Sequence, residues 1–505
     1  MTIYNFNHGI GWASSGVEYA QAYRAKIFRR INEPAKFIFT DFFPTENIEN
    51  FTAKIGFADQ EVIWLYQYFS DIRIAPNSFK LEQLEQSINF NQRNGELEVL
   101  SGKKVRLNFR QENQFVTAYL LAEGSQIVER AEFVINNKLI RKDFYTYTKV
   151  FSEYYTPQEK KARLYMRRFF NQDGSIAYDQ LLDSGSELYR FPQRILYSKE
   201  ELLAYFIESL NLKAQDTIIL DRATDIGQVV YRHCKPAKIG VVIHADHFSE
   251  SITNETQILW NNYYEYQFDN AKRTDFFITA TDSQNKLLSS QFKKYKNFIP
   301  KIVTIPVGGL EKLELPQEKR RKHSLITASR LAAEKHIDWL VIAVTKAHNK
   351  LADISLDIYG EGGKHSEIEK IIEANHAESY IKLKGHHDLA KVYQKYEMYV
   401  SASTSEGFGL TLMEAVGSGL MMVGFDVRYG NQTFIEQQKN GLLLPYNESD
   451  GLEKITTNIA NAIVESLTDF SQKDLEKESY EIGRHYLMSN ISQDWQKLLE
   501  ELRHD

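Results

Sequence analysis

The chain has 505 residues, more than one hydrophobic core usually supports, so we expect roughly two to four domains. Its 43% hydrophobic and 25% charged content are those of a folded globular protein, and the net charge of −6 excludes a generally basic, nucleic-acid-binding surface. The single cysteine, Cys234, excludes a disulfide framework, favours a reducing cytoplasm, and is expected to be a small buried hydrophobe rather than a nucleophile.

The beginning of the chain carries no targeting or membrane signal. Residues 1–7 lack the basic region and apolar stretch of a signal peptide. No run approaches the ~18 apolar residues that a membrane-spanning helix needs. We therefore expect a cytoplasmic protein that associates with the inner face of the cell membrane only peripherally.

The first segments predict the opening unit of an α/β nucleotide-binding domain. Residues 3–6 form an apolar run, 8–16 a glycine-rich turn, 17–30 a helical pattern and 36–39 a second apolar run. This strand-turn-helix-strand order is typical of such a domain. The turn resembles a dinucleotide fingerprint with altered glycine spacing, which by itself is weak evidence for any particular ligand.

The pattern changes from about residue 79 to 191. Short strand-like runs of alternating charged and apolar residues follow one another, separated by turn signals at Asn136-Asn137, Asp173-Gly174 and Ser184-Gly185. This pattern predicts an antiparallel β-meander, with one face in water, inserted into the first α/β domain.

Strands alternating with helices return at residue 198, and charged residues crowd 311–322, which we interpret as an interdomain linker. A second α/β domain is expected from residue 324, and a final helix at 492–502. The predicted domains are an N-terminal Rossmann-like domain in two parts (1–45 and 196–310), the inserted meander (46–195), a C-terminal Rossmann-like donor-binding domain (311–490) and a C-terminal helix (491–505).

The strongest chemical signal is segment 403–414, Ser-Thr-Ser-Glu-Gly-Phe-Gly-Leu-Thr-Leu-Met-Glu. A strand is expected to end near Ala402 and an apolar helix to begin near Leu410, and the N–H groups at such a helix start bind diphosphate oxygens. Glu406 lies in the loop, where it could bind sugar hydroxyls. Glu414 lies about one turn into the helix, where it could bind a ribose diol. The alternative is a glycine-rich turn with one capping glutamate.

A second signal is the pair Arg330 and Lys335, which follows a predicted strand at 324–328. Arginine binds phosphate oxygens bidentately, and lysine adds a point charge. Two such cations can stabilise a departing diphosphate without a metal. Alone, this segment would be interpreted as a solvated helix start, so the functional interpretation depends on its pairing with the Glu406 loop.

Together these four side chains resemble the signature of the retaining GT-B glycosyltransferases. In that family the arginine and lysine neutralise the donor diphosphate, the first glutamate holds the donor sugar, and the second holds the ribose. The resemblance implies an α/β fold with two Rossmann-like domains facing a cleft. It also implies nucleotide-sugar contacts along the loop, from Glu406, Gly407, Phe408, Gly409, Leu410 and Glu414.

The same resemblance implies roles outside the loop. Gly16 would let the N-terminal backbone approach the donor phosphates. Lys384, Gly385 and His386 end a strand where the family binds uracil. His244, at the end of another strand, would contact the donor sugar or assist catalysis, with a buried core histidine as the alternative. The expected catalytic residues are then Glu406, Arg330, Lys335 and His244.

Residues 1–20 and the meander narrow the resemblance to the GtfA-like catalytic subunits of the accessory-secretion glycosyltransferases of Gram-positive cocci. This resemblance implies transfer of N-acetylglucosamine from UDP-GlcNAc to Ser and Thr of a serine-rich repeat adhesin, together with a homologous GtfB subunit. The meander would then bind that partner or the acceptor. The sequence has no Asp-x-Asp of metal-dependent GT-A enzymes, no Walker A loop, no His-Glu-x-x-His and no Cys-x-x-Cys, so neither a metal nor a cofactor is expected.

Three alternatives stay open from the sequence. The first is a non-catalytic sugar-polypeptide-binding subunit, although such a homologue would tend to lose the four charged residues. The second is a retaining glycosyltransferase that acts on a cell-wall polymer, because teichoic-acid α-glycosyltransferases share a similar meander. The third is an oxidoreductase using the glycine-rich turn, with Glu33 or Asp41 as its ribose ligand.

Overall fold

The computed structural model describes residues 1–11, 15–43, 45–158 and 161–504. Its internal contacts divide the chain into two units. Unit 1 comprises Met1–Ala25, Glu33–Gly240 and Asn262–Thr274, and unit 2 comprises Lys26–Asn32, Val241–Asn261 and Asp275–Asp505. In the described ranges, no helix combines the length and the apolar character needed to cross a membrane.

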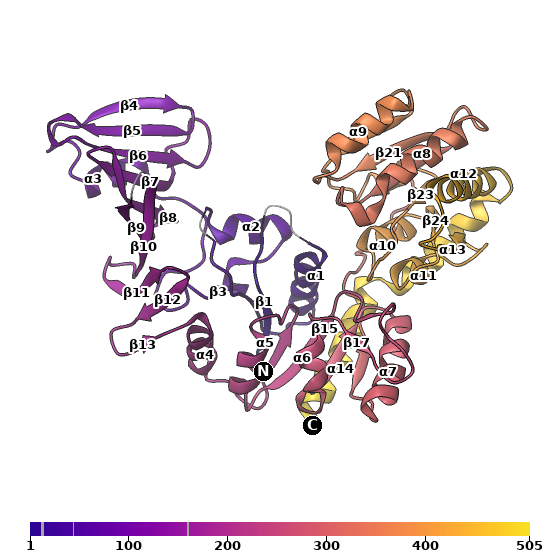
Figure 1. Cartoon of the computed structure of the whole chain (residues 1–505), viewed down its shortest axis with the longest axis horizontal. Helices are drawn as coiled ribbons and strands as arrows, with labels where there is room; N and C mark the ends of the chain where they lie inside the picture. Colours follow the sequence, from indigo (N-terminus) through magenta and orange to yellow (C-terminus); the bar gives the residue numbers. More distant parts are fainter. Residues whose placement is uncertain (12–14, 44, 159–160, 505) are drawn as a thin grey trace. The chain divides into compact units, whose positions relative to one another are not determined.

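Unit 1 begins with parallel strands (Figure 1). β1 pairs with β14 on one side and β2 on the other, and β2 pairs with β3. These strands are mostly apolar and mostly buried, as expected for parallel strands covered on both faces. The elements of this part, which lie wholly or partly in unit 1, are β1 (Ile3–Asn7), α1 (Gly16–Arg30), β2 (Ala35–Phe39), α2 (Ile48–Ile55), β3 (Val62–Trp64), α3 (Leu81–Ser87), α4 (Lys199–Ser209), β14 (Thr217–Leu220), α5 (Gly227–His233), β15 (Lys238–Ile243) and α6 (Glu265–Asp269). Of these, α1 and β15 end within residues assigned to unit 2.

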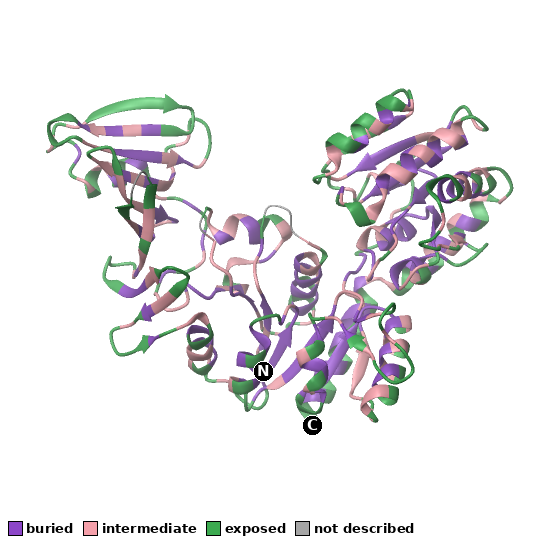
Figure 2. Cartoon of the chain, in the orientation of Figure 1, coloured by how far each residue is buried: buried purple, intermediate pink, exposed green. Residues whose placement is uncertain are grey.

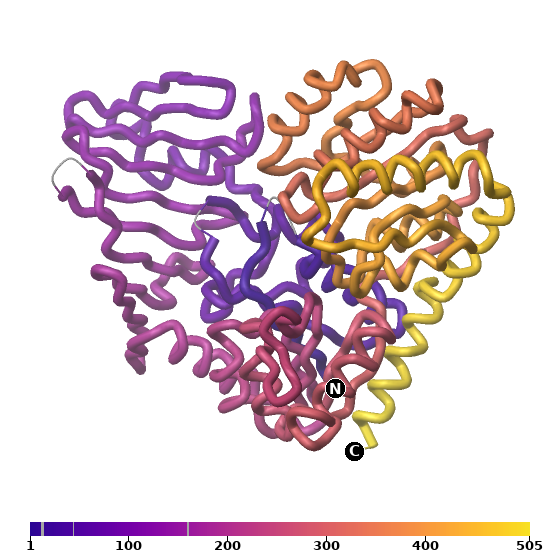
Figure 3. The backbone as a smooth tube through the Cα atoms, turned by 45° about the vertical axis from the view of Figure 1, so that its right-hand side comes forward, coloured from indigo at the N-terminus to yellow at the C-terminus, as the bar shows by residue number. Residues whose placement is uncertain are grey.

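A ten-stranded antiparallel sheet lies between α3 and α4 in the chain, and each strand pairs with its neighbours in sequence (Figure 3). The predicted meander is therefore confirmed. Its strands are β4 (Glu96–Ser101), β5 (Lys104–Phe109), β6 (Gln114–Leu120), β7 (Val128–Ile135), β8 (Lys138–Tyr145), β9 (Lys149–Gln158), β10 (Lys161–Phe170), β11 (Ile176–Asp183), β12 (Ser186–Arg190) and β13 (Ile195–Leu196).

Two of the predicted hairpin turns have the backbone geometry that their sequences favour. Asn136 and Asn137 have φ angles of 50° and 60°, and Ser184 and Gly185 have 49° and 91°. Two successive left-handed residues are what the common two-residue hairpin turn requires. The predicted solvent-exposed face is also present. β5 alternates buried and more exposed residues, and β4 is exposed along its whole length (Figure 2).

Unit 2 contains the second α/β sheet, six parallel strands in the order β22-β21-β20-β23-β24-β25. Buried aliphatic residues of its strands and helices form the core. The elements of unit 2 are β16 (Phe248–Ser249), β17 (Leu259–Trp260), β18 (Phe276–Thr279), α7 (Asp282–Lys296), β19 (Ile302–Thr304), β20 (Ser324–Ala328), α8 (Ile337–His348), β21 (Ser355–Tyr359), α9 (His365–Ala374), β22 (Ile381–Gly385), β23 (Met398–Val400), α10 (Leu410–Gly417), β24 (Met421–Phe425), α11 (Gly430–Phe434), β25 (Gly441–Leu444), α12 (Leu452–Thr468), α13 (Gln472–His485) and α14 (Met488–His504).

Two features of unit 2 differ from the sequence interpretation. The last helix, α14, begins at Met488 rather than at Ser492, because Met488 and Ile491 add buried contacts to its apolar face. The end of the predicted linker is fixed to the second domain. Arg320 is buried and donates to the carbonyl oxygens of Tyr396 and Ser418, both at 2.6 Å.

Candidate functional site

The predicted loop connects β23 to α10 in unit 2. The strand ends at Val400, rather than near Ala402, and the helix begins at Leu410, as predicted. Gly409 has a φ angle of 87°, a left-handed conformation that favours glycine. A Cβ on Gly407 would lie 2.5 Å from the carbonyl oxygen of His244. The two glycines therefore allow a close backbone approach to His244 and a sharp turn into α10.

Glu406 is held through its main chain and its side chain. Its N–H donates to the carbonyl of Arg428 at 3.2 Å, and its carbonyl accepts from the N–H groups of Tyr429 and Gly430 at 2.7 and 2.8 Å. Its carboxylate lies 2.6 Å from Nζ of Lys335, and these side chains are 21% and 17% exposed, respectively. The structure thus joins two predicted catalytic residues in one partly exposed ion pair.

Arg330 is placed differently, in the loop after β20. Its guanidinium is 62% exposed and contacts Glu334, which is 48% exposed, at 3.3 Å. A surface pair of this kind contributes about 0–1 kcal/mol, so Arg330 can exchange Glu334 for an anionic ligand at little cost. The structure therefore brings Lys335, but not Arg330, to the carboxylate of Glu406.

Glu414 lies on α10, where its carboxylate accepts a hydrogen bond from the hydroxyl of Tyr393 at 3.1 Å. Close by, the Tyr399 hydroxyl donates to the carbonyl of Ala328 at 3.0 Å and lies 2.9 Å from Thr411 Oγ1. Burial, with a smaller contribution from the nearby carboxylates, raises the pKa of Tyr399. This neutral tyrosine links the end of β20 to the start of α10.

Lys384, Gly385 and His386 lie at the end of β22, with the lysine and histidine exposed. Gly385 has a φ angle of 70°, and its carbonyl accepts from the N–H of Gly360 at 2.8 Å. β20, β22 and β23 are parallel strands of one sheet, so the three predicted segments that follow them emerge at the same edge. That edge is where α/β sheets bind ligands.

His244 follows β15 and is partly buried. The next residues form a polar cluster with Tyr429. The Tyr429 hydroxyl donates to Asp246 at 2.8 Å and lies 3.2 Å from Nδ1 of His247. His247 is fully buried, its Nε2 lies 2.7 Å from Oε1 of Gln291, and burial lowers its pKa to about 4. His247 is therefore a neutral histidine that braces the segment carrying His244.

Sequence reasoning missed this cluster and its neighbour Arg428. The Arg428 guanidinium lies 3.0 Å from Glu250 and 3.5 Å from Asp246. Arg428 belongs to no recognisable sequence motif. Asp246 and His247 could have been predicted as functional residues, because the polar run His-Ala-Asp-His follows a buried strand. The cluster matters because Tyr429 and Arg428 are also the main-chain partners of Glu406.

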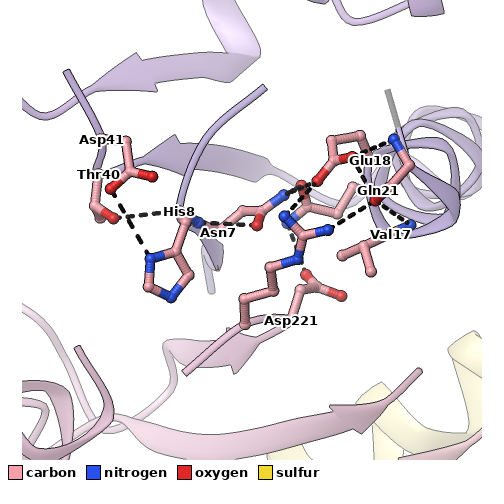
Figure 4. A network of polar contacts seen from close by, with 10 residues as sticks. Asn7, His8, Val17, Glu18, Gln21, Thr40, Asp41 and Asp221 are labelled. Carbon is pink, nitrogen blue, oxygen red and sulfur yellow. Dashed lines mark hydrogen bonds and ion pairs between the residues drawn. The ribbon is translucent and has the colours of Figure 1, made fainter. Parts of the chain in front are cut away.

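Gly16 begins α1 in unit 1, and residues 12–14 of the predicted glycine-rich turn lie outside the described residues. Side chains in the first half of α1 are tied to the ends of β1 and β14 by a polar network (Figure 4). Glu18 accepts from the N–H and hydroxyl of Ser15, both at 2.6 Å, and from Asn7 at 3.1 Å. Arg24 makes two 2.8 Å contacts to Asp221. The network fixes the start of the helix that carries Gly16.

Among the residues that the structure describes, no three His, Cys, Asp or Glu side chains gather as a metal site would require. The Glu406 loop and its neighbours offer cations, carboxylates and main-chain N–H groups. These groups suit a substrate with both a diphosphate and hydroxyls.

Two Rossmann-like α/β sheets, an inserted antiparallel sheet and this loop define a glycosyltransferase of the GT-B class. Family models agree: "Glycosyl transferases group 1" matches residues 322–469, and "GtfA extended beta-sheet domain" matches residues 97–193. The chain is 52% identical, over 100% of its length and 99% of the relative, to the UDP-N-acetylglucosamine–peptide N-acetylglucosaminyltransferase GtfA subunit of Streptococcus gordonii. The chain belongs to this GtfA family.

Solved structures agree with this assignment. The crystal structure of the pneumococcal O-GlcNAc transferase GtfA in complex with UDP and GlcNAc has a TM-score of 0.95 and 50% identity, covering 100% of this chain and 99% of that one. The crystal structure of a GtfA/B complex has a TM-score of 0.94 and 51% identity, covering 100% of both chains. The predicted fold class is therefore confirmed.

Proposed function

We propose that this chain transfers N-acetylglucosamine from UDP-GlcNAc to Ser and Thr hydroxyls of a serine-rich repeat adhesin, acting with a homologous GtfB subunit. The observation that carries the proposal is the 2.6 Å pair of Lys335 and Glu406 in the loop before α10. It lies in a chain whose full length matches GtfA subunits named as UDP-N-acetylglucosamine–peptide N-acetylglucosaminyltransferases. The single buried cysteine is compatible with action in a reducing cytoplasm, and any membrane association would be peripheral.

The donor diphosphate would be held by Arg330, Lys335 and the N–H groups at the start of α10. Arg330 is exposed and weakly paired, so it can turn to the phosphates. Lys335 keeps the Glu406 carboxylate in place and would share its charge with the diphosphate. Glu406 would accept hydroxyls of the sugar, and Glu414 those of the ribose.

Further contacts would complete the donor site. The uracil would lie against Lys384, Gly385 and His386, and the backbone at Gly16 would approach the phosphates. His244 would hold the sugar, because Gly407 brings the loop against its main chain. Gly407, Phe408, Gly409 and Leu410 would supply backbone contacts.

The transfer would retain the configuration of the sugar by substitution on one face. The bond between C1 of the sugar and the UDP oxygen breaks while the acceptor oxygen bonds to C1. The leaving phosphate accepts the acceptor's proton. Arg330 and Lys335 would stabilise the charge that develops on the phosphate, which is the task that a metal performs in other transferases.

The ten-stranded sheet is the surface proposed for the partner and the acceptor. β4, at its edge, is exposed throughout, and a sheet edge can bind an extended chain by strand addition. The GtfA/B complex of a relative supports a GtfB partner for this chain.

The test is a transfer assay with purified chain, UDP-GlcNAc and a Ser/Thr-rich polypeptide, with and without the GtfB homologue, read by intact-protein mass spectrometry. We expect successive additions of N-acetylhexosamine, and about 100-fold or greater slowing in Glu406→Ala with unchanged thermal unfolding. UDP-glucose and a poly(glycerol phosphate) acceptor serve as comparisons. Preference for either of them, or normal transfer by Glu406→Ala, would overturn the proposal.

A further inference from the structure

A cavity of about 240 Å³ lies in unit 1, between the start of α2 and strands β6 to β9 of the ten-stranded sheet. None of its lining residues belongs to the loops assigned to the donor. The lining consists of Thr45, Glu46, Asn47, Ile48, Trp64, Gln67, Asn77, Tyr119, Glu129, Arg130, Phe144, Tyr145, Thr146, Val150 and Phe151.

Three buried polar atoms of the lining lack a hydrogen-bond partner in the part of the chain that the structure describes. They are the hydroxyl of Thr146, which is 4% exposed, Oε2 of Glu46 and Nε of Arg130. Native proteins satisfy most buried polar atoms, so three such atoms at one cavity call for an explanation. Hydrogen-bonding groups of a bound molecule would provide it.

The other polar groups of this wall are fixed in place. Asn77 donates to the carbonyl of Tyr145 at 2.6 Å, and its own Oδ1 accepts from Asn47 at 2.9 Å. Asn47 Oδ1 in turn caps α2 by accepting from the N–H of Glu49. The cavity is therefore held in shape by hydrogen bonds before any ligand enters.

The charge of the lining favours a neutral ligand that donates hydrogen bonds. Burial raises the pKa of both Glu46 and Glu129. The charge of Glu46 raises the pKa of Glu129 further, against smaller opposing effects of Lys103 and Arg130. Arg130 is stacked on the ring of Tyr119, and its Nε lies 3.4 Å from Glu132 without forming a hydrogen bond. The two carboxyls outnumber this one arginine in the lining, which disfavours phosphate, and carboxyl oxygens accept hydrogen bonds from hydroxyls well.

Aromatic rings form the apolar part of the wall. Phe144 and Phe151 stack with centroids 4.3 Å apart, and Trp64 lies 6.3 Å from Phe151. Rings beside carboxyl, hydroxyl and amide groups suit a molecule with apolar C–H faces and a rim of hydroxyls. The volume is below the range of about 300–1,000 Å³ for drug-sized ligands, so the cavity fits one ring rather than a nucleotide.

We propose that this cavity is a second carbohydrate site, which holds one neutral pyranose residue with Glu46, Glu129 and Thr146 as its hydroxyl partners. The site is separate from the donor loop, whose residues all belong to unit 2. The sugar arrives either as a free monosaccharide or as a residue attached to a polypeptide. Binding can be measured without transfer, so the assignment stands or falls independently of the proposed reaction.

The test is hydrogen–deuterium exchange on the full chain with three probes: N-acetylglucosamine, a Ser/Thr peptide carrying N-acetylglucosamine, and the same peptide unmodified. If a free sugar is sufficient for binding, both N-acetylglucosamine and the glycosylated peptide should slow the exchange of residues 144–151. If the sugar must be attached to a polypeptide, only the glycosylated peptide should do so. The double variant Glu46→Gln/Glu129→Gln should weaken this protection at least tenfold, and Thr146→Val should weaken it with little change of volume.

Glu82→Gln, an exposed residue of α3 outside the cavity, is the matched control and should bind as the unmodified chain does. Protection of residues 401–410 by UDP reports the donor site separately and should not change in any of these variants. The assignment is overturned if neither sugar probe protects 144–151, or if the double variant, folded by thermal unfolding, is protected equally. Equal protection of these residues by the unmodified peptide would make this a polypeptide site instead, and would equally overturn the assignment.

Discussion

Two arginine–carboxylate pairs show how one chemistry serves two purposes in this chain. Arg24 and Asp221 in unit 1 are 3% and 0% exposed, with two 2.8 Å contacts and a further hydrogen bond from Gln21 to Asp221 at 2.7 Å. Arg330 and Glu334 in unit 2 are 62% and 48% exposed and make one contact at 3.3 Å.

The difference follows from desolvation. A charge removed from water must be fully paired, and removing its partner is costly, so the buried pair belongs to the fold. The exposed pair contributes little and can be exchanged for a ligand. Lys335 and Glu406 lie between these extremes: their 2.6 Å contact orients the carboxylate, while about a fifth of each side chain stays exposed.

The buried pair should give the largest effect on stability. Asp221→Ala leaves Arg24 charged and buried, so we expect the free energy of unfolding to fall by about 3–5 kcal/mol. Urea denaturation of the purified chain measures this loss. The double variant Arg24→Met/Asp221→Leu should recover most of it, because no uncompensated charge is left.

The folded fraction of Asp221→Ala should transfer N-acetylglucosamine at a nearly normal rate, because the Arg24–Asp221 pair stabilises the fold and takes no part in the reaction. If Asp221→Ala instead lost transfer activity with only a small change in stability, Asp221 would take part in the reaction, and the buried pair would not be purely structural.

Arg330→Ala should have the opposite profile. We expect transfer to slow by about 100- to 1,000-fold, since a preorganised cation at the leaving diphosphate is lost, with the thermal unfolding midpoint nearly unchanged. Arg330→Lys should recover only part of the rate, because lysine cannot bind phosphate bidentately. Steady-state kinetics and calorimetry on the same preparations separate the two effects. A large drop in the unfolding midpoint would show that Arg330 supports the fold.

The sequence predicted those parts that local chemistry determines. The left-handed pairs Asn136-Asn137 and Ser184-Gly185 marked hairpins, and the glycines before Leu410 marked the start of α10. Arg24 appeared only as one position in a helical pattern, and its partner is 197 residues away. Tyr429 reaches Asp246 across 183 residues. Such pairs depend on tertiary packing, which no local spacing encodes.

His247 gives a smaller, pH-dependent effect. Its pKa is lowered to about 4 by burial, from 6.5 in a solvated histidine. The unfolded chain therefore takes up a proton near pH 6.5 and the folded chain only near pH 4, so acidification over this window favours unfolding by up to about 1.4 kcal/mol per pH unit.

His247→Gln should flatten this part of the stability profile, measured as the unfolding midpoint between pH 7 and pH 5. The exposed His485→Gln on α13 is the matched control and should leave the slope unchanged. An unaltered slope in His247→Gln would mean that this histidine is not held neutral by burial.

The smallest effect should come from the other half of the exposed pair. Glu334→Ala removes the ion pair that the Arg330 guanidinium makes with a side chain four residues away. Such a pair contributes a few tenths of a kcal/mol, so stability should change by less than about 0.5 kcal/mol. The Arg330 charge is kept and loses a competing carboxylate, so kcat/KM for the donor should stay the same or rise less than about twofold, with any gain reduced at high salt. Donor kinetics at two ionic strengths measure this change. If Glu334→Ala instead slowed transfer as much as Arg330→Ala, the pair would act as a unit, and exposure would not distinguish a ligand-binding arginine from a structural one.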